Sequence, residues 1–484
     1  MRAVLRIWAL LALVIPYLVV AAPTVTRQSS TQLDAQGIFF VSYDGLVNVE
    51  SFQQSGVVTH NGYQYAGWYT STRYAIIARR QLPSGSWSTL QLPHQLSVND
   101  SHNVIAIGIS PSDGRIHIAM DTHSTVLFYV KSVANLAGAP GSFAWTVSQF
   151  GAVQNTLDGL SVTNQFTYPQ FLTTPDNRLQ LFYRSAVSGN GVAQVAEYNG
   201  ASWANLGGFS SATGSYTYNG ATSTARNLYI NGVTYSSTGR LHTSGTWREN
   251  NGGVLCASGG LTNHDTIWLY SDDRGRTWYN NGGTKVATTG SSTVSVTTSG
   301  IIVDSLDPNH GLINASPSLV RLISAANYLR IQQESQTVDS TNQPHIIISY
   351  VPGRFTQCVK SYAADRTSYA RPFHLYRNSS GTWTKVEIPF ALGSTGRSQI
   401  VMDASDNVYV VLPFLKIVTA SKSSGWTDWT LAYDGVAAGL NAFGEVTVDR
   451  PRVKSEGVLS VLYQVKSSGT TPSAVVVADF KLNG

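Results

Sequence analysis

Four residues of this sequence have the types and the spacing for proton transfer beside an anion. His102 and His123 lie 21 positions apart, and Tyr168 and Arg184 lie 16 positions apart. β-Elimination from a uronic acid needs a cation on the carboxylate at C5, a base for the C5 proton and an acid for the oxygen that leaves C4. Arginine binds carboxylates through its planar guanidinium, and histidine and tyrosine can exchange protons. The four residues are therefore a candidate catalytic set, and the sequence leaves open which of them is the base and which the acid.

The sequence lacks the motifs of several other enzyme classes. It shows no paired-carboxylate arrangement for glycoside hydrolysis, no Gly-x-Ser-x-Gly turn, no HExxH motif and no phosphate-binding loop. No ligand set for a metal stands out either, so we assign no metal site. We expect a reaction that requires no cofactor, with a structural calcium as the open alternative.

The histidine pair must be positioned by residues 99–132. This stretch contains two alternating apolar segments around a Ser-Pro-Ser-Asp-Gly turn, which is the pattern of a β-hairpin. His102 precedes the first segment and His123 follows the second, so pairing of the two strands brings both imidazoles to the end away from the turn. His117 lies inside the second strand, and we interpret it as structural.

Tyr168 and Arg184 flank the next hairpin pattern, over residues 166–191. The same pairing argument makes them neighbours, at the same rim as the histidines. Nearby positions of this repeat and its neighbours supply candidate substrate contacts, with Arg248 or Arg226 as a second cation. These candidates are Asn103, Arg226, Tyr229, Arg248 and His264.

A polar turn followed by alternating apolar residues recurs seven times along the chain, which indicates a repeat architecture. The turn residues are Gly62, Gly114, Asn177, Gly239, Gln343, Asn407 and Gly457. A second strand pattern follows each turn, so each repeat supplies two hairpins. We therefore predict an all-β fold, a single seven-bladed β-propeller of four-stranded antiparallel blades over residues 23–484. Two unrelated β-sandwiches, the alternative, would not repeat at this spacing.

Two further segments have structural interpretations. Residues 271–278, SDDRGRTW, fit the Asp-box pattern S-x-D-x-G-x-T-W. We interpret Asp273 as the cap of a hairpin turn and not as a catalytic residue. Residues 25–56 contain strand-like runs, and we expect an N-terminal strand there to complete the last blade and remove its exposed edge.

Residues 1–22 have the composition of a signal peptide. Arg2 and Arg6 precede an apolar run that is interrupted by Pro16 and ends in small residues. A membrane anchor is the alternative, but no later stretch is long and apolar enough to span a bilayer. We therefore expect a secreted, extracellular protein.

The composition agrees with a secreted β protein. Charged residues make up only 12% of the chain, and there are 43 glycines. The formal net charge of +5 comes without runs of lysine or arginine, which argues against nucleic acid as a partner and suits an acidic polysaccharide. We expect a monomer without membrane partners. Sequence alone does not decide whether Cys256 and Cys358, the two cysteines, form a disulfide.

Residues 99–132, 166–191 and 263–278 resemble propeller-type polysaccharide lyases, whose members include bacterial ulvan lyases. The segments are most similar to the fungal L-rhamnose-α-1,4-D-glucuronate lyases that trim gum arabic. This resemblance implies a seven-bladed propeller and β-elimination at a uronate. It also implies that His102, His123 and Tyr168 transfer protons and that Arg184 neutralises the carboxylate.

We therefore expect a lyase that cleaves a rhamnose–glucuronate linkage in an arabinogalactan-type glycan and leaves a 4,5-unsaturated uronate. A sialidase-like exo-glycosidase is one alternative, because the Asp-box pattern and the fold also suit that class. A non-catalytic carbohydrate-binding propeller is the other. Such lectins repeat a sugar site in every blade, whereas the candidate residues here are confined to the second to fourth repeats.

Overall fold

The computed structural model describes residues 22–43, 45–52, 55–218, 221–250, 263–305, 334–352, 354–355 and 362–484. The expected signal peptide lies outside the described residues, apart from Ala22, and so do Cys256 and Cys358. Among the described helices, none has the length and apolar character needed to cross a bilayer.

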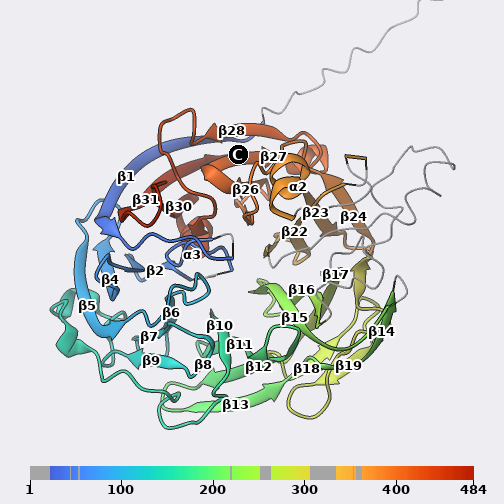
Figure 1. Cartoon of the computed structure of the whole chain (residues 1–484), viewed down its shortest axis with the longest axis horizontal. Coiled ribbons are helices and arrows are strands. Elements are labelled where there is room, and N and C mark those ends of the chain that lie inside the picture. Colours follow the sequence, from blue (N-terminus) through green and yellow to red (C-terminus); the bar gives the residue numbers. More distant parts are fainter. Residues whose placement is uncertain are drawn as a thin grey trace, which may run out of the picture.

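The chain is all-β, and its antiparallel sheets are arranged around a central axis as in a propeller (Figure 1). The first sheet contains β2 (Val57–His60), β3 (Tyr63–Tyr69), β4 (Tyr74–Gln81) and β5 (Ser88–Gln95). The second contains β6 (Ala106–Ser110), β7 (Arg115–Met120) and β9 (Phe128–Lys131). The third contains β8 (His123–Thr125), β10 (Phe166–Thr173), β11 (Leu179–Val187), β12 (Asn190–Tyr198) and β13 (Trp203–Gly208).

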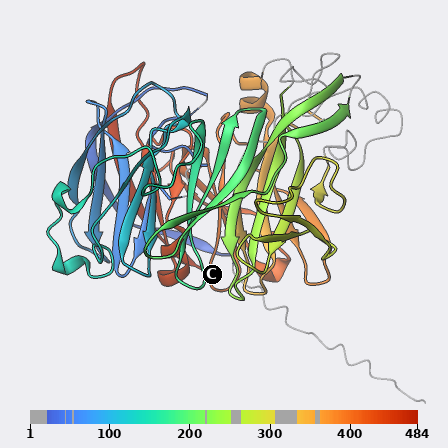
Figure 2. The ribbon, with the colours of Figure 1, turned by 90° about the horizontal axis from the view of Figure 1, so that it is seen from below.

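The fourth sheet is the largest and contains β14 (Thr213–Tyr218), β15 (Ala221–Tyr235), β16 (Leu241–Glu249), β17 (Asn263–Ser271), β18 (Thr277–Tyr279), β19 (Lys285–Thr288) and β20 (Ile302–Asp304). In a side view, the β14–β15 hairpin extends beyond the neighbouring strands on one face of the ring (Figure 2).

The fifth sheet contains β21 (Ser335–Val338), β22 (Pro344–Tyr350), β23 (Arg371–Arg377) and β24 (Trp383–Glu387). The sixth contains β25 (Gln399–Met402), β26 (Val408–Leu412), β27 (Lys416–Ala420) and β28 (Thr430–Asp434). The seventh contains β29 (Thr447–Val448), β30 (Val458–Gln464), β31 (Ser473–Asn483) and the N-terminal strand β1 (Thr24–Gly37). The helices are α2 (Tyr362–Tyr369) and α3 (Arg450–Glu456), with short 3₁₀ turns η1 (Pro140–Ser142), η2 (Val147–Gln149), η3 (Pro413–Leu415) and η4 (Lys422–Ser424).

The prediction of seven four-stranded blades is wrong, because the described part of the chain forms six blades with four or more strands. The second repeat forms only the three-stranded sheet β6-β7-β9. Where its fourth strand was expected, the chain carries η1 and η2, and among the described residues the only β-bridge to β9 from this segment is the isolated one between Tyr129 and Gln154. Pro140, which begins η1, cannot donate a ladder hydrogen bond, and this disfavours a continuous strand.

An N-terminal strand closes the ring, as predicted, but it lies earlier than the apolar run that suggested it. β1 pairs with β31 from Thr24 opposite Asn483 to Gly37 opposite Ser473. The apolar residues that follow β1, including Phe39 and Phe40, are buried without joining a named strand. This segment instead passes on to the histidine pair described below.

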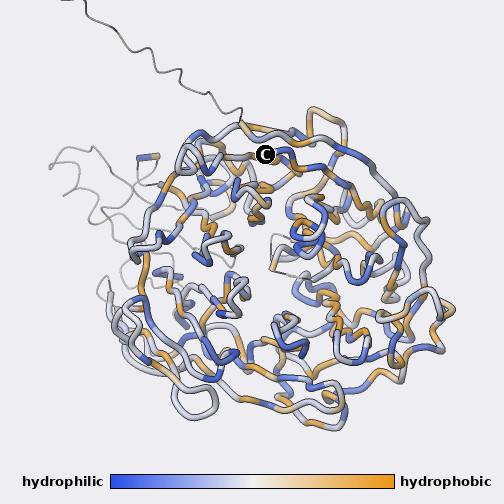
Figure 3. The backbone as a smooth tube through the Cα atoms, turned by 180° about the vertical axis from the view of Figure 1, so that it is seen from behind, coloured by the Kyte–Doolittle hydropathy of each residue, from blue (hydrophilic) through white to orange (hydrophobic). Residues whose placement is uncertain are grey.

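The hydrophobic core is divided among several clusters rather than gathered in one centre. Apolar segments occur all round the ring (Figure 3), and separate clusters of buried side chains join successive sheets. Each buried Val, Leu or Ile contributes about 1.5–3 kcal/mol relative to exposure. The interfaces between sheets thus fix the inner strands, whose ends carry the candidate site.

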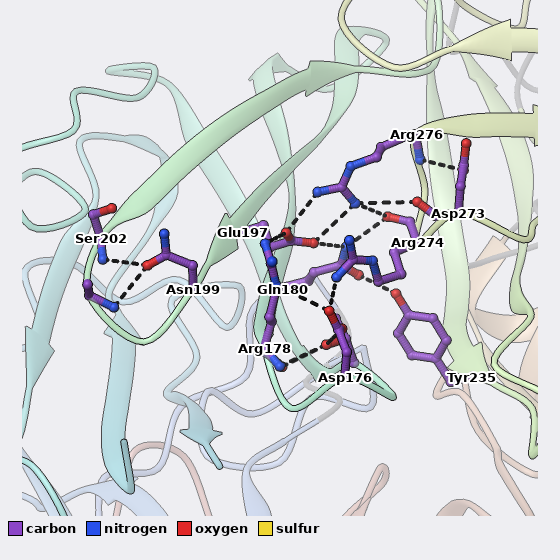
Figure 4. A network of polar contacts seen from close by, with 12 residues as sticks. Asp176, Arg178, Gln180, Glu197, Asn199, Ser202, Tyr235, Asp273, Arg274 and Arg276 are labelled. Atoms are coloured by element: carbon purple, nitrogen blue, oxygen red, sulfur yellow. Dashed lines mark hydrogen bonds and ion pairs between the residues drawn. The ribbon is translucent and has the colours of Figure 1, made fainter. Parts of the chain in front are cut away.

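A polar network also joins the third and fourth sheets (Figure 4). Glu197 on β12 accepts hydrogen bonds from Arg178 and Arg276 at 2.9 and 2.8 Å. In the hairpin turn at residues 271–278, the Asp273 carboxylate accepts the Thr277 backbone N–H at 2.7 Å. This network links blades and lies apart from the residues discussed next.

Candidate active site

Asp100 joins the two candidate histidines. His102 Nδ1 lies 2.8 Å from one Asp100 oxygen, and His123 Nδ1 lies 2.5 Å from the other. The two rings stack with centroids 4.1 Å apart and planes inclined by 18°. The predicted proximity of His102 and His123 is confirmed, whereas Asp100 was not among the expected site residues.

Two different segments deliver the histidines. His102 lies in a turn before β6, where its backbone N–H donates to Asp100 Oδ1 at 2.9 Å. Ser101 ties this turn to Ser42, since its Oγ donates to the Ser42 carbonyl at 2.7 Å. His123 begins β8, which pairs with β10 of the next sheet and not with the hairpin that the sequence suggested.

Burial and hydrogen bonding set the charges of His102 and Asp100. Burial lowers the pKa of His102 to about 4, although the hydrogen bond to Asp100 opposes the shift. Burial disfavours the charged form of Asp100 too, but its hydrogen bonds from His102 and His123 outweigh that effect and hold the pKa of the carboxyl well below its usual range. Near neutral pH, His102 is therefore neutral beside an ionised Asp100.

Tyr168 occupies a strained position in β10. Its φ of 59° lies in the left-handed region, which is uncommon for a bulky residue. The β10–β11 pairing shifts register between Thr167 and Gln170, so Tyr168 sits in a bulge. Bulges and strained backbone concentrate next to functional sites, where they re-aim a side chain. Here the Tyr168 ring lies 5.8 Å from the His102 ring and 6.4 Å from the His123 ring.

Arg184 is a buried cation without a carboxylate partner among the described residues. Its Cζ lies 4.9 Å from the centre of the Tyr168 ring, which confirms their predicted proximity. One terminal nitrogen, Nη2, donates to Ser124 Oγ and Thr167 Oγ1, both at 3.0 Å. Nε and Nη1 are buried, and neither has a hydrogen-bond partner in the part of the chain that the structure describes. Unpaired buried N–H groups are costly, so this guanidinium is suited to bind an anion that enters the site.

Tyr229 extends the site across β15. The Tyr168 and Tyr229 rings meet edge to face with centroids 5.9 Å apart, and Tyr229 Oη lies 2.8 Å from Ser188 Oγ. Burial opposes ionisation of Tyr229, but Arg184, the Ser188 hydroxyl and Arg248 together lower its pKa. Burial raises the pKa of Tyr168, so its hydroxyl keeps its proton.

A second group of side chains supports the histidine pair from behind. Phe52 stacks on His102 with centroids 5.4 Å apart, and Arg397 lies over the Phe52 ring. Arg397 Nη1 donates to Glu50 and to Glu445, each at 2.9 Å. Burial and the neighbouring Glu445 raise the pKa of Glu50 well above its usual range, so Glu50 holds a proton. The Arg397 charge is thus already compensated, in contrast to that of Arg184.

Two of the predicted substrate contacts lie in a separate cluster. Arg226 is fully buried and donates to Glu249 Oε1 at 2.7 Å, so it cannot serve as the second cation that the sequence suggested. His264 is held between Glu249 and Asp265 and stacks on Tyr216. Carboxylates on both sides raise its pKa despite burial. These residues join the β14–β15 hairpin to β16 and β17 and do not form the Arg184 site.

Of the other three predicted contacts, Tyr229 lies in the site as described above, and Asn103 and Arg248 lie at or beside it. Asn103 follows His102, its side chain is buried, and its Oδ1 has no hydrogen-bond partner in the described part of the chain. Arg248 influences Tyr229 electrostatically and donates a hydrogen bond to the Glu249 carbonyl. A role in substrate binding stays a prediction for both.

Sequence reasoning missed several residues of the site. Asp100 carried a signal, because an Asp two positions before His102 is typical of a turn that its side chain closes. Phe52 and Arg397 gave none, since they come from distant loops. Tyr43 was not predicted from the sequence either. It is 64% exposed, and its ring lies edge-on to both histidines, with centroid distances of 4.7 Å to His102 and 6.0 Å to His123.

Asp100, His102 and His123 also form the one cluster of at least three potential metal ligands detected among the described residues, with ligand atoms within 4.8 Å of one another. A carboxylate and two imidazoles are donors that zinc accepts. A metal bound at Nδ1 requires the loss of the Nδ1 proton, whereas N···O distances of 2.8 and 2.5 Å fit charge-assisted hydrogen bonds. The geometry therefore favours protons over a metal in this trio.

Comparison with known proteins gives curated relatives that match only in part. An ulvan lyase, long isoform, from Pseudoalteromonas sp. (strain PLSV) is 28% identical over 180 residues, covering 30% of this chain and 18% of that protein. An ulvan lyase, short isoform, from Alteromonas sp. (strain LOR) is 24% identical over 184 residues, covering 30% of this chain and 35% of that protein. The chain thus spans only a minor part of the length of these relatives.

Solved structures show the same fold over nearly the whole chain. The crystal structure of polysaccharide lyase Uly1 has a TM-score of 0.66 at 18% identity, covering 94% of this chain and 99% of that one. A PL25 ulvan lyase bound to -[GlcA(1-4)Rha3S]- has a TM-score of 0.60 at 13% identity, covering 92% and 94%. At such identities the likeness concerns the fold.

The sequence profile of one family covers more than half of the chain. Residues 63–321 match the profile described as "BNR repeat-containing family member". This span includes the histidine pair, Tyr168 and Arg184. The chain belongs to the BNR repeat-containing family.

Proposed function

We propose that this protein is a secreted polysaccharide lyase that cleaves a rhamnose–glucuronate linkage by β-elimination and leaves a 4,5-unsaturated uronate. The observation that carries this proposal is the buried Arg184 guanidinium, whose Nε and Nη1 have no hydrogen-bond partner among the described residues, beside Tyr168 and the histidine pair. Elimination at a uronate requires a cation that can bind the carboxylate and, next to it, groups that can transfer protons.

Arg184 would bind the carboxylate at C5 of the uronate. A carboxylate can bind along either edge of the planar guanidinium, through Nη2 together with Nε or with Nη1, and Nη2 also donates to the Ser124 and Thr167 hydroxyls. Neutralising the carboxylate makes the C5 proton more acidic and stabilises the negative charge that develops there. Low solvent exposure, 3% for Arg184, strengthens this interaction.

The histidines would supply the base and Tyr168 the acid. His102 is neutral near neutral pH, and its Nδ1 is engaged by Asp100, so Nε2 is the atom that can accept a proton. Tyr168 keeps its proton and can donate it. The base takes the C5 proton, the C–H electrons form the C4=C5 bond, the C4–O bond breaks, and the leaving oxygen takes the tyrosine proton. No cofactor takes part in these steps.

The comparisons support an acidic, uronate-containing polysaccharide as the substrate. The curated relatives are ulvan lyases, and one solved neighbour is bound to a glucuronate–rhamnose oligosaccharide. A glucuronate–rhamnose unit also occurs in the arabinogalactan-type glycan of gum arabic, and we propose this glycan as the substrate. We further propose that the protein acts as an extracellular monomer.

The described arginines argue against the sialidase-like alternative. That class grips a sialate carboxylate with three arginines, but Arg226 and Arg397 are each bound to glutamates here. The lectin alternative would need a sugar site in every blade, whereas the described proton-transfer groups gather at one rim. Neither alternative explains why Arg184 adjoins a histidine–aspartate cluster.

The proposal is tested by incubating the protein with gum arabic, ulvan and carboxyl-reduced gum arabic while following the ultraviolet absorbance of the conjugated C4=C5 bond. We expect a rise with intact gum arabic, none after carboxyl reduction, and loss of the rise in Arg184→Ala and His123→Ala. Arg240→Ala is the matched control, because Arg240 forms an exposed pair with Asp272 elsewhere in the ring. Saturated products, or binding without any product, would contradict the lyase.

A further inference from the structure

We propose that Asp100 is a positioning residue that fixes His102 and His123 in the same tautomer, with a proton on each Nδ1 and a free lone pair on each Nε2. The inference concerns the histidine pair itself, and only its kinetic consequence rests on the proposed function. Asp100 touches neither substrate nor reacting atoms in this account, since both its oxygens are occupied by the two rings.

The hydrogen-bond pattern carries the tautomer assignment. An ionised carboxylate can only accept hydrogen bonds. Asp100 Oδ1 lies 2.8 Å from His102 Nδ1, and Asp100 Oδ2 lies 2.5 Å from His123 Nδ1. Each Nδ1 must therefore carry a hydrogen, so each neutral ring has no hydrogen on Nε2. Within the described part of the chain, the hydrogen bonds of both rings are made by Nδ1, and none is made by Nε2.

The shared carboxylate also explains why two imidazoles tolerate stacking at 4.1 Å. Two protonated rings at this distance would repel each other, and one carboxylate compensates only one positive charge. A neutral pair with both Nδ1–H groups aimed at one anion avoids this repulsion. The arrangement therefore holds two proton acceptors side by side in a mostly buried site.

The tautomer has a consequence for the division of labour. Neither neutral histidine can donate a proton from Nε2, so the acid of the reaction must come from another group, which the site supplies as Tyr168. Of the two Nε2 lone pairs, one suffices for the C5 proton. The other is free to accept a hydrogen bond from a sugar hydroxyl and so to orient the ring.

Other charged and titratable groups also face His102 and contribute to its titration. They come from several elements, namely Asp100 in its own turn, His123 on β8, Tyr168 on β10, Tyr43 in the N-terminal segment, and Arg397 across the Phe52 ring. Of these, Asp100 is the one anion, so its replacement removes the only carboxylate among the described residues that touches both rings.

The test is ¹⁵N NMR of histidine-labelled protein near neutral pH, with signals assigned through His102→Gln and His123→Gln. Wild type should show both rings protonated at Nδ1 only. Asp100→Asn presents one acceptor and one donor, so at least one ring should change to the Nε2–H tautomer. A wild-type ring protonated at Nε2, or stoichiometric zinc retained at the pair, would overturn the inference, whether or not the protein is a lyase.

A kinetic arm separates positioning from stability. If the protein is a lyase, Asp100→Asn should lower kcat by about 10²–10⁴-fold, with a small change in KM, and Asp100→Glu should recover part of it. Asp339→Asn is the matched control. Asp339 contacts His345, and His345 stacks on His374, so a similar Asp–His–His group is altered in a blade other than those of the candidate site. Equal losses in both variants, or tautomers unchanged in Asp100→Asn, would refute a positioning role.

Discussion

At the scale of single residues, the site is defined by a difference between two arginines. Arg397 is held by two glutamates, one of them protonated, so its charge is compensated within the protein. Among the described residues, Arg184 has hydroxyl partners for one nitrogen and none for the other two. A substrate carboxylate would supply the hydrogen-bond acceptors that Arg184 lacks. It would not be attracted to Arg397 in the same way, because the charge of Arg397 is already compensated.

Replacing Arg184 should therefore affect the chemical step. We expect Arg184→Lys to lower kcat by about 10²–10³-fold, because an ammonium group is a point charge and cannot pair with both carboxylate oxygens. Steady-state kinetics on a uronate glycan measure this loss. Arg240→Lys, on the exposed surface, should retain wild-type kinetics; comparable kinetics in Arg184→Lys would show that the guanidinium fork is not needed.

The low pKa of His102 predicts the pH behaviour of the protein. With a pKa of about 4, the ring remains a base well below the ordinary histidine range, so the acid limb of kcat/KM should lie below about pH 6.5. Since the folded-state pKa is depressed, the stabilisation is present above about pH 6.5 and is lost as the pH falls toward 4. Chemical unfolding at several pH values measures this slope, which His102→Gln should reduce. An unchanged slope would contradict the assignment.

At the scale of elements, the bulge in β10 brings Tyr168 and Arg184 together. The bulge lets Tyr168 project beside Arg184 while Thr167 bonds both the Arg184 guanidinium and the Ser124 backbone N–H. A regular strand would alternate its side chains between the two faces of the sheet. The bulge therefore positions Tyr168 in the site.

Thr167→Val tests the bulge without a change of shape. We expect a fall in kcat of about 10-fold and a loss of roughly 1–3 kcal/mol of stability, because two donors lose an acceptor. Thr173→Val at the exposed end of the same strand is the matched control. Kinetics and denaturant unfolding of the two variants measure both effects, and identical behaviour would show that Thr167 does not hold Arg184.

The sequence predicted the site better than the elements that build it. Alternating patterns located the seven inner turns, and they placed Tyr168 beside Arg184. They placed His123 at the end of a hairpin, whereas it belongs to β8 in the next sheet. Asp100 was recognisable only by its distance from His102, and Arg397 is brought in by a loop from far along the chain. Long-range packing carries no local pattern, so such contacts are not readable from one sequence.

At the scale of the whole molecule, the ring depends on its closure. β1 covers β31 along most of its length, and Ser29 adds a hydrogen bond to Asp479 at 2.9 Å. Without β1, the edge of β31 would expose unpaired backbone groups, which favours aggregation. The second repeat, by contrast, needs no additional strand, because its three-stranded sheet is flanked on both sides by larger sheets.

Deleting residues 24–37 should destabilise the entire ring. Loss of the β1–β31 ladder should cost roughly 5 kcal/mol or more, at about 0.5–1.5 kcal/mol for each hydrogen bond lost, and should promote aggregation. Thermal unfolding and light scattering measure these effects. Ser29→Ala, which removes one side-chain bond, should change the midpoint only slightly, and equal midpoints for the deletion and wild type would show that closure is dispensable.

The most direct test of the central claim is the fate of water in the reaction. The protein is incubated with a glucuronate–rhamnose glycan in oxygen-18 water, and the products are analysed by mass spectrometry. Elimination predicts a uronate product that is lighter by one water than the hydrolysis product and has a C4=C5 bond, and it predicts no oxygen-18 in either fragment when they are analysed before the free reducing end exchanges its oxygen with water. A saturated product that carries oxygen-18 at the new chain end would show hydrolysis and contradict elimination.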